Sequence, residues 1–147
     1  MARRTSRPAR PARTSRTADS PCPCGLAASY GVCCGRFHSG QATAPTAELL
    51  MRSRYSAFVV RDGAYLLRTW HPGTRPASVE FDREMRWSGL EILETADGSV
   101  FHDTGTVTFA AHYTHGDAPG ALRERSRFER CGGGWVYVNG TFEDSAV

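Results

Sequence analysis

Four of the five cysteines lie within thirteen residues, and their spacing is the strongest chemical signal in the sequence. Cys22 and Cys24 are separated by one residue and Cys33 and Cys34 are adjacent, so neither pair reaches good disulfide geometry without strain. Disulfides between the two pairs would need an oxidising compartment, which nothing else in the sequence indicates. A zinc ion binds four thiolates at about 2.3 Å and accepts closely spaced ligands where the backbone turns sharply. The cluster therefore predicts a zinc site, with free thiols in a reducing compartment as the alternative.

Residues that permit sharp turns surround the cysteines, namely Pro23, Gly25, Gly31 and Gly35. His38 follows Cys34 by four residues and is a fifth candidate ligand. Four thiolates would close the coordination shell, whereas a catalytic zinc keeps one position for water. We therefore expect a structural zinc ion, whose binding would supply most of the folding free energy of this segment, on the order of 10 kcal/mol.

Residues 22–35 resemble the SEC-C motif, a small zinc-binding module found at the C-terminal end of the translocation ATPase SecA. The matching positions are Cys22, Pro23, Cys24, Gly25, Tyr30, Cys33, Cys34 and Gly35. The resemblance implies that the fourth metal ligand is Cys34 rather than His38. Residues 26–28 are Leu-Ala-Ala where the motif has Ser-Gly-Lys, so the resemblance does not extend to a partner contact made through that lysine.

The first 20 residues differ in composition from the rest of the 147-residue chain. They consist mainly of Arg, Pro, Ala, Thr and Ser, which predicts a disordered, arginine-rich tail over 1–20. Six arginines and one acidic residue fall there, which favours weak nucleic-acid binding; a solvated tail or a start codon placed too far upstream are the alternatives. The segment lacks the apolar region of a secretory signal, and no run reaches membrane-spanning length. We therefore expect a cytoplasmic protein with no membrane span.

The residues after a polar linker over 39–45 predict a helix that begins behind Thr46, a suitable N-cap. Its apolar stripe, at about 100° per residue, contains Ala47, Met51, Tyr55 and Phe58. Arg54 falls inside this stripe. Because an unpaired buried guanidinium costs several kcal/mol, we expect either an acidic partner from a neighbouring element or a polar pocket around Arg54.

Asp62 and Gly63 interrupt the helical pattern, and a second helix is predicted over 64–70 because Pro72 follows it closely. The pattern of 74–83 is ambiguous, with a turn expected at Arg75 and Pro76. From 86 onward the apolar period changes to two, which predicts strands over 87–94, 106–113, 122–131 and 135–139, with a turn at 96–98. In the third strand, Arg123, Arg125 and Arg127 share one face that we expect to be solvated, with a phosphate site as the alternative. Two helices followed by an antiparallel meander predict an α+β fold.

Several stretches also resemble the YchJ-like family of bacterial proteins: residues 46–58, 69–72, 87–90, 124–128 and 135–137. The resemblance covers roughly residues 20–140. It implies a nuclear-transport-factor-2-like domain over 45–142, in which a curved sheet wraps around helices into a cone, preceded by a SEC-C-like zinc module over 21–39. Some family members carry a second SEC-C motif at the C-terminus, and we expect no function here that needs two zinc modules. The resemblance supplies a fold and no biochemical activity.

Two functions remain open on these grounds. In the first, the chain is a non-enzymatic adaptor whose zinc module docks onto a protein or ribonucleoprotein partner. In the second, the interior of the cone binds an unidentified small molecule or performs acid–base chemistry. The candidate residues for that interior are Arg54, Tyr55, His71, Asp82 and Tyr113.

Overall fold

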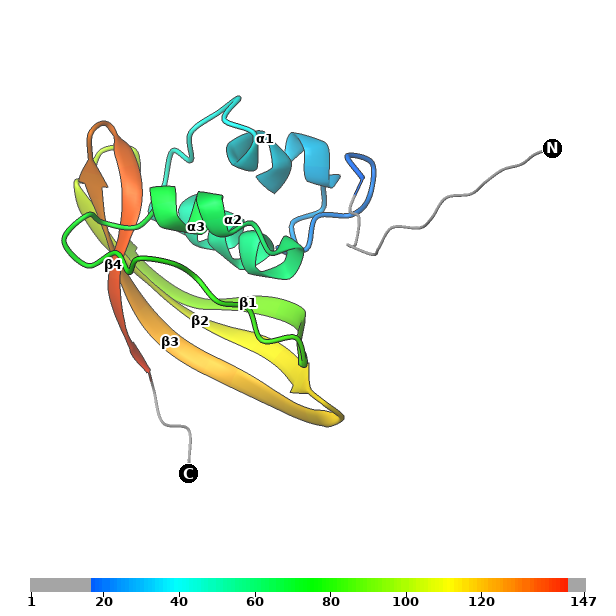
Figure 1. The fold of residues 1–147 in the computed structure, drawn as a ribbon. Coiled ribbons are helices and arrows are strands. Elements are labelled where there is room, and N and C mark those ends of the chain that lie inside the picture. The colour runs from blue at the N-terminus through cyan, green and yellow to red at the C-terminus, as the bar shows by residue number, and fades with distance from the viewer. Residues whose placement is uncertain (1–16, 143–147) are drawn as a thin grey trace.

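The computed structural model describes residues 17–142, which form three layers (Figure 1). A four-stranded sheet is the first layer, and α2 (Ala47–Val60) and α3 (Gly63–Arg68) cover one of its faces. The cysteine-rich segment contains the 3-10 helix η1 (Tyr30–Val32) and α1 (Cys34–His38), which lie on the side of α2 and α3 away from the sheet. Residues 1–16 of the predicted arginine-rich tail lie outside the described residues.

Local side-chain chemistry sets where α2 and α3 begin. The hydroxyl of Thr46 accepts a hydrogen bond from the Leu49 amide at 3.1 Å, so α2 begins where the sequence predicts. It ends at Val60, where the following residue, Arg61, adopts a left-handed conformation with φ 62°. Asp62 then caps α3 by accepting a hydrogen bond from the Tyr65 amide. The second helix ends at Arg68, two residues earlier than predicted, because Trp70 turns to form a β-bridge with Tyr137.

The sheet is an antiparallel meander with strand order β1-β2-β3-β4. Its strands are β1 (Met85–Asp97), β2 (Thr104–His115), β3 (Ala118–Cys131) and β4 (Gly134–Phe142), each longer than predicted. The predicted turn at 96–98 is wrong at its first two positions, since Ala96 and Asp97 still pair with Thr106 and Gly105. Strand pairing thus extends β1 to Asp97, and the turn continues through Gly98, which has a φ of 79°.

The core lies between α2, α3 and the inner face of the sheet. Ala47, Met51 and Tyr55 are buried and Phe58 is half-buried, as the apolar stripe predicts. They meet Val107, Phe109, Ala111 and Phe128 of the sheet in one hydrophobic cluster. Arg123, Arg125 and Arg127 are exposed on the opposite face of β3. These features confirm the predicted α+β fold with helices packed on an antiparallel sheet.

The cysteine-rich segment includes residues that we had assigned to the tail. The amide of Tyr30 donates to the carbonyl of Ser20 at 2.7 Å, and the amide of Gly31 donates to the carbonyl of Ala18 at 2.9 Å. Residues 18–20 therefore form part of the folded cysteine segment. The tail boundary at residue 20 stays a prediction, and the structure adds these hydrogen bonds from the cysteine segment to the carbonyls of Ala18 and Ser20.

Candidate metal centre

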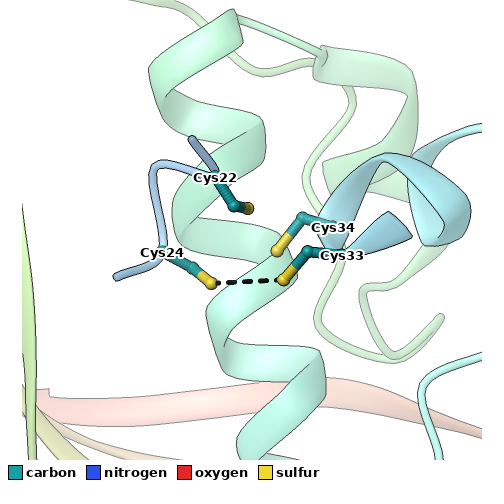
Figure 2. A group of neighbouring side chains, drawn as sticks. All are labelled: Cys22, Cys24, Cys33 and Cys34. Atoms are coloured by element: carbon teal, nitrogen blue, oxygen red, sulfur yellow. Dashed lines mark hydrogen bonds between the residues drawn. The ribbon is translucent and has the colours of Figure 1, made fainter. Parts of the chain in front are cut away.

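The side chains of Cys22, Cys24, Cys33 and Cys34 converge on one point beside α2 (Figure 2). All four are buried, and their sulfur atoms lie within 4.8 Å of one another. In a tetrahedral site with metal–sulfur bonds of about 2.3 Å, neighbouring sulfurs are about 3.8 Å apart. The Sγ atoms of Cys24 and Cys33 are 3.7 Å apart. The four thiols therefore fit a tetrahedral metal ion.

A tight loop presents the first two cysteines. The amide of Cys22 donates to the carbonyl of Ala28, and the amide of Gly25 donates back to the carbonyl of Cys22 at 3.3 Å. Gly25 has a φ of 93°, a conformation that residues with a Cβ rarely adopt. The loop thereby turns the sulfurs of Cys22 and Cys24 to the same side.

The second pair lies where η1 passes into α1. The amide of Cys33 donates to the carbonyl of Tyr30, which closes η1 and leaves Cys34 as the first residue of α1. Gly35 packs against Tyr30 so closely that a Cβ on it would lie 2.7 Å from the carbonyl oxygen. This explains in structural terms why a glycine follows the cysteine pair.

The thiols strongly influence one another's ionisation. Hydrogen bonds from the thiols of Cys24 and Cys34 hold the pKa of Cys22 well below its usual range. Hydrogen bonds to Cys22 and Cys24, together with burial, raise the pKa of Cys34, and burial raises the pKa of Cys33 to about 12. Ionising one thiol therefore opposes ionisation of the next, and a bound cation would balance the charge of the full set. Sulfur donors of this kind suit zinc and iron and do not suit magnesium or calcium.

His38 lies beside the cluster but turns both ring nitrogens elsewhere. Nε2 lies 2.8 Å from the carbonyl oxygen of Ser53, to which it can only donate, so Nδ1 accepts from the Tyr30 hydroxyl at 2.6 Å. Burial lowers the pKa of His38, which favours this neutral ring. In the described structure, His38 thus connects the cysteine segment to α2.

Two side chains of α2 reach the cluster from outside. Nη1 of Arg52 donates to the carbonyl of Cys24 at 2.8 Å, and the hydroxyl of Ser56 lies 3.7 Å from the sulfur of Cys22. Sequence reasoning missed both residues because it treated the cysteine motif and the helix as separate units. The available signal was the four-residue spacing of Arg52 and Ser56, which places them on one helical face.

Arg54 satisfies neither of the two expectations stated for it. Its guanidinium is buried, and Nη1 donates to the carbonyl of Leu66 at 2.8 Å and to the hydroxyl of Thr69 at 2.7 Å. The guanidinium also lies 4.9 Å from the ring centroid of Trp70 and 4.7 Å from that of Tyr137. Burial lowers the pKa of Arg54 to about 10, so the side chain remains charged at neutral pH. Carbonyl, hydroxyl and aromatic groups therefore take the place of the expected acid or open pocket.

The other predicted interior residues do not gather at one point. The rings of Tyr55 and Tyr113 both contact Trp87, at centroid distances of 6.3 and 5.6 Å. His71 lies at the edge of β4, where its amide donates to the carbonyl of Tyr137. Tyr55 and Tyr113 therefore lie near Trp87 of β1, whereas Arg54 and His71 lie near Tyr137 of β4.

A groove of about 700 Å³ lies between the end of α2 and the segment leading into β1. Its walls include Phe58, Phe81, Asp82 and Trp87, but none of Arg54, Tyr55, His71 and Tyr113. Asp82 is hydrogen-bonded to the Glu84 amide and to the ring of His115 at 2.9 Å, and these bonds lower its pKa. The Asp82 carboxylate in the groove is therefore already engaged by two hydrogen-bond donors.

No helix in the described part of the chain is long and apolar enough to cross a membrane.

Two solved structures share the fold. A SEC-C motif containing protein from Rhodopseudomonas palustris superposes with a TM-score of 0.73 at 30% identity, covering 84% of this chain and 98% of that protein. A SEC-C motif containing protein from Psychrobacter arcticus gives a TM-score of 0.69 at 26% identity, covering 88% of this chain and 86% of that protein. Both names agree with the resemblance seen in residues 22–35.

Sequence relatives extend over nearly the whole chain. A UPF0225 protein of Streptomyces avermitilis is 66% identical over 140 residues, which is 95% of this chain and 94% of the relative. A UPF0225 protein of Enterobacter sp. is 46% identical over 127 residues, which is 82% of each chain. The family model described as "YchJ, middle NTF2-like domain" matches residues 46–140. The chain therefore belongs to the YchJ-like UPF0225 family and contains that family's middle NTF2-like domain.

Proposed function

We propose that the chain binds one structural zinc ion through Cys22, Cys24, Cys33 and Cys34 and acts as a non-enzymatic adaptor. The observation that carries this proposal is the set of four buried thiols whose sulfurs lie within 4.8 Å of one another. All four ligand positions of a tetrahedral ion would come from the protein, which leaves no position for a reacting water. The ion would therefore order the chain rather than take part in a reaction.

A protein or ribonucleoprotein is the partner class that we propose for this adaptor. Support comes from two apolar side chains exposed on the cysteine segment, Leu26 at 38% and Val32 at 66%. Val32 belongs to η1, which lies with α1 on the side of the helices away from the sheet, so a partner could approach Val32 without contacting the strands (Figure 1). Contiguous exposed apolar surface marks protein interaction sites, and the proposal requires that Leu26 and Val32 contribute to one such surface.

Metal content tests the zinc part of the proposal. Purified wild-type protein should contain about one zinc ion per chain, because four thiolates satisfy a single ion. The double variant Cys22→Ser/Cys24→Ser should lose the metal, since two ligands are removed. Cys131→Ser is the matched control, because Cys131 is an exposed cysteine outside the cluster. A metal-free wild type, or equal metal content in the double variant, would contradict the proposal.

Site-specific crosslinking tests the adaptor part. A photoreactive residue placed at Val32 should give a discrete crosslinked product in cells of the native host. The same residue placed at Val100, which is 53% exposed on the turn between β1 and β2, should not. Products of equal yield from both positions, or from neither, would argue against docking through the cysteine segment.

A further inference from the structure

Ser56 occupies an unusual place in α2. It lies in the interior of the helix, its side chain is 0% exposed, and its hydroxyl lies 3.7 Å from the sulfur of Cys22. Buried hydroxyl groups need hydrogen-bond partners, and in the described structure the sulfur of Cys22 lies within hydrogen-bond distance of the Ser56 hydroxyl.

Ser53 provides an internal comparison one turn earlier in the same helix. It is equally buried, but its hydroxyl donates to the carbonyl of Leu50 at 2.7 Å, the usual arrangement for a serine inside a helix. Its oxygen also lies 2.7 Å from the hydroxyl of Tyr65. Both serines are buried in the same helix. The hydroxyl of Ser53 faces a backbone carbonyl and a tyrosine, whereas the hydroxyl of Ser56 faces the cysteine cluster.

The direction of the hydrogen bond follows from the chemistry of a metal ligand. A cysteine that binds a metal is a thiolate, which has no proton to donate. The hydroxyl of Ser56 must then be the donor toward Cys22. Such a bond orients a ligand and withdraws electron density from sulfur, which changes how firmly the metal is held.

We propose that Ser56 is a positioning residue of the metal centre, whose hydroxyl donates to the thiolate of Cys22 and increases metal retention. This inference rests on the proposed zinc site. Ser56 belongs to the NTF2-like domain, whereas all four ligands precede that domain in the chain. Arg52, one turn earlier on the same face, holds the carbonyl of Cys24 and places a second group of α2 against the ligand loop. The metal centre is therefore built jointly by the cysteine segment and α2.

The test compares Ser56→Ala with Ser53→Ala in the full chain. Alanine removes one oxygen atom, adds no volume and favours helix, so both variants should fold, which circular dichroism can verify. Competition with a chromophoric zinc chelator should show an affinity about 10-fold to 100-fold lower for Ser56→Ala, the usual effect of removing an outer hydrogen bond. Ser53→Ala should lose stability against denaturant and keep the wild-type zinc affinity.

Cobalt substitution gives a readout that a purely structural role would not change. Cobalt(II) bound to thiolates shows sulfur-to-metal charge-transfer absorption, whose energy falls when sulfur becomes richer in electrons. This band should move to longer wavelength in Ser56→Ala and stay in place in Ser53→Ala.

Different failures of this experiment have different meanings. A wild type that binds neither zinc nor cobalt overturns the proposed function and this inference together. A wild type that binds metal, with unchanged affinity and absorption in Ser56→Ala, overturns the inference alone. Equal losses of affinity in both serine variants would assign the effect to helix packing and would also overturn it.

Discussion

The guanidinium of Arg54 lies between the rings of Trp70 and Tyr137, and Tyr137 in turn connects it to an acid. The hydroxyl of Tyr137 donates to Oε2 of Glu124 at 2.9 Å, and the hydroxyl of Ser126 donates to the same oxygen at 2.8 Å. Glu124 is 7% exposed. Buried positive and negative charges therefore lie on either side of one tyrosine, and each has its own neutral hydrogen-bond partners.

Replacement of Arg54 by methionine tests whether this arrangement supports the fold. Arg54→Met should lower the free energy of unfolding by about 3 kcal/mol, because the carbonyl of Leu66 and the hydroxyl of Thr69 lose a buried donor and the two rings lose a cation. Urea denaturation followed by circular dichroism measures the difference.

Arg125→Met is the control for that measurement, because Arg125 is exposed on the outer face of β3 and should tolerate the same change. An Arg54→Met protein as stable as wild type would mean that the guanidinium serves a binding role and not the fold.

The periodicity of α2 places Arg54 on the buried stripe, but its partners come from the end of α3 and from β4. Such contacts between distant segments leave no mark in a local pattern.

Elements whose ends depend on nearby side chains are the ones that sequence reasoning predicts best. Thr46 fixes the start of α2, and Asp62 separates α2 from α3, as their side-chain chemistry indicates. Strand ends depend instead on a partner strand. Residues 96 and 97 have turn-like composition, yet they remain in β1 because β2 pairs with them. Residues 74–83, whose pattern is ambiguous, contain neither helix nor strand.

The metal centre shows the same division between local and distant information. The spacing of the cysteines is sufficient to predict which sulfurs converge, because short turns bring them together. The roles of Arg52 and Ser56 depend on how α2 packs against that loop, which the sequence alone does not specify. His38 was a plausible ligand by spacing, and only tertiary contacts with Tyr30 and Ser53 explain why its ring points away.

At the scale of the whole molecule, the cysteine segment is tied to the helices at several points. His38 donates to the carbonyl of Ser53, and Nη2 of Arg68 donates to the carbonyls of Phe37 and His38 at 3.2 and 2.9 Å. The ring of His38 also packs against Tyr65, with centroids 4.6 Å apart. Metal binding and the folding of the helix–sheet domain should therefore be coupled.

Removal of the metal tests this coupling directly. All three tryptophans, Trp70, Trp87 and Trp135, lie outside the cysteine segment, so their fluorescence reports on the helix–sheet domain. A zinc chelator should lower the thermal midpoint seen by tryptophan fluorescence, by about 4 °C for each kcal/mol of coupling. A ligand that binds only the folded state stabilises everything that unfolds with its site, so cobalt absorption and tryptophan fluorescence should change together on heating.

The Cys131→Ser protein should respond to the chelator like wild type, because that cysteine lies outside the cluster. If the tryptophan midpoint stays fixed while the metal is lost, the cysteine segment is an independent unit, and its contacts with α2 and α3 add nothing to the stability of the domain.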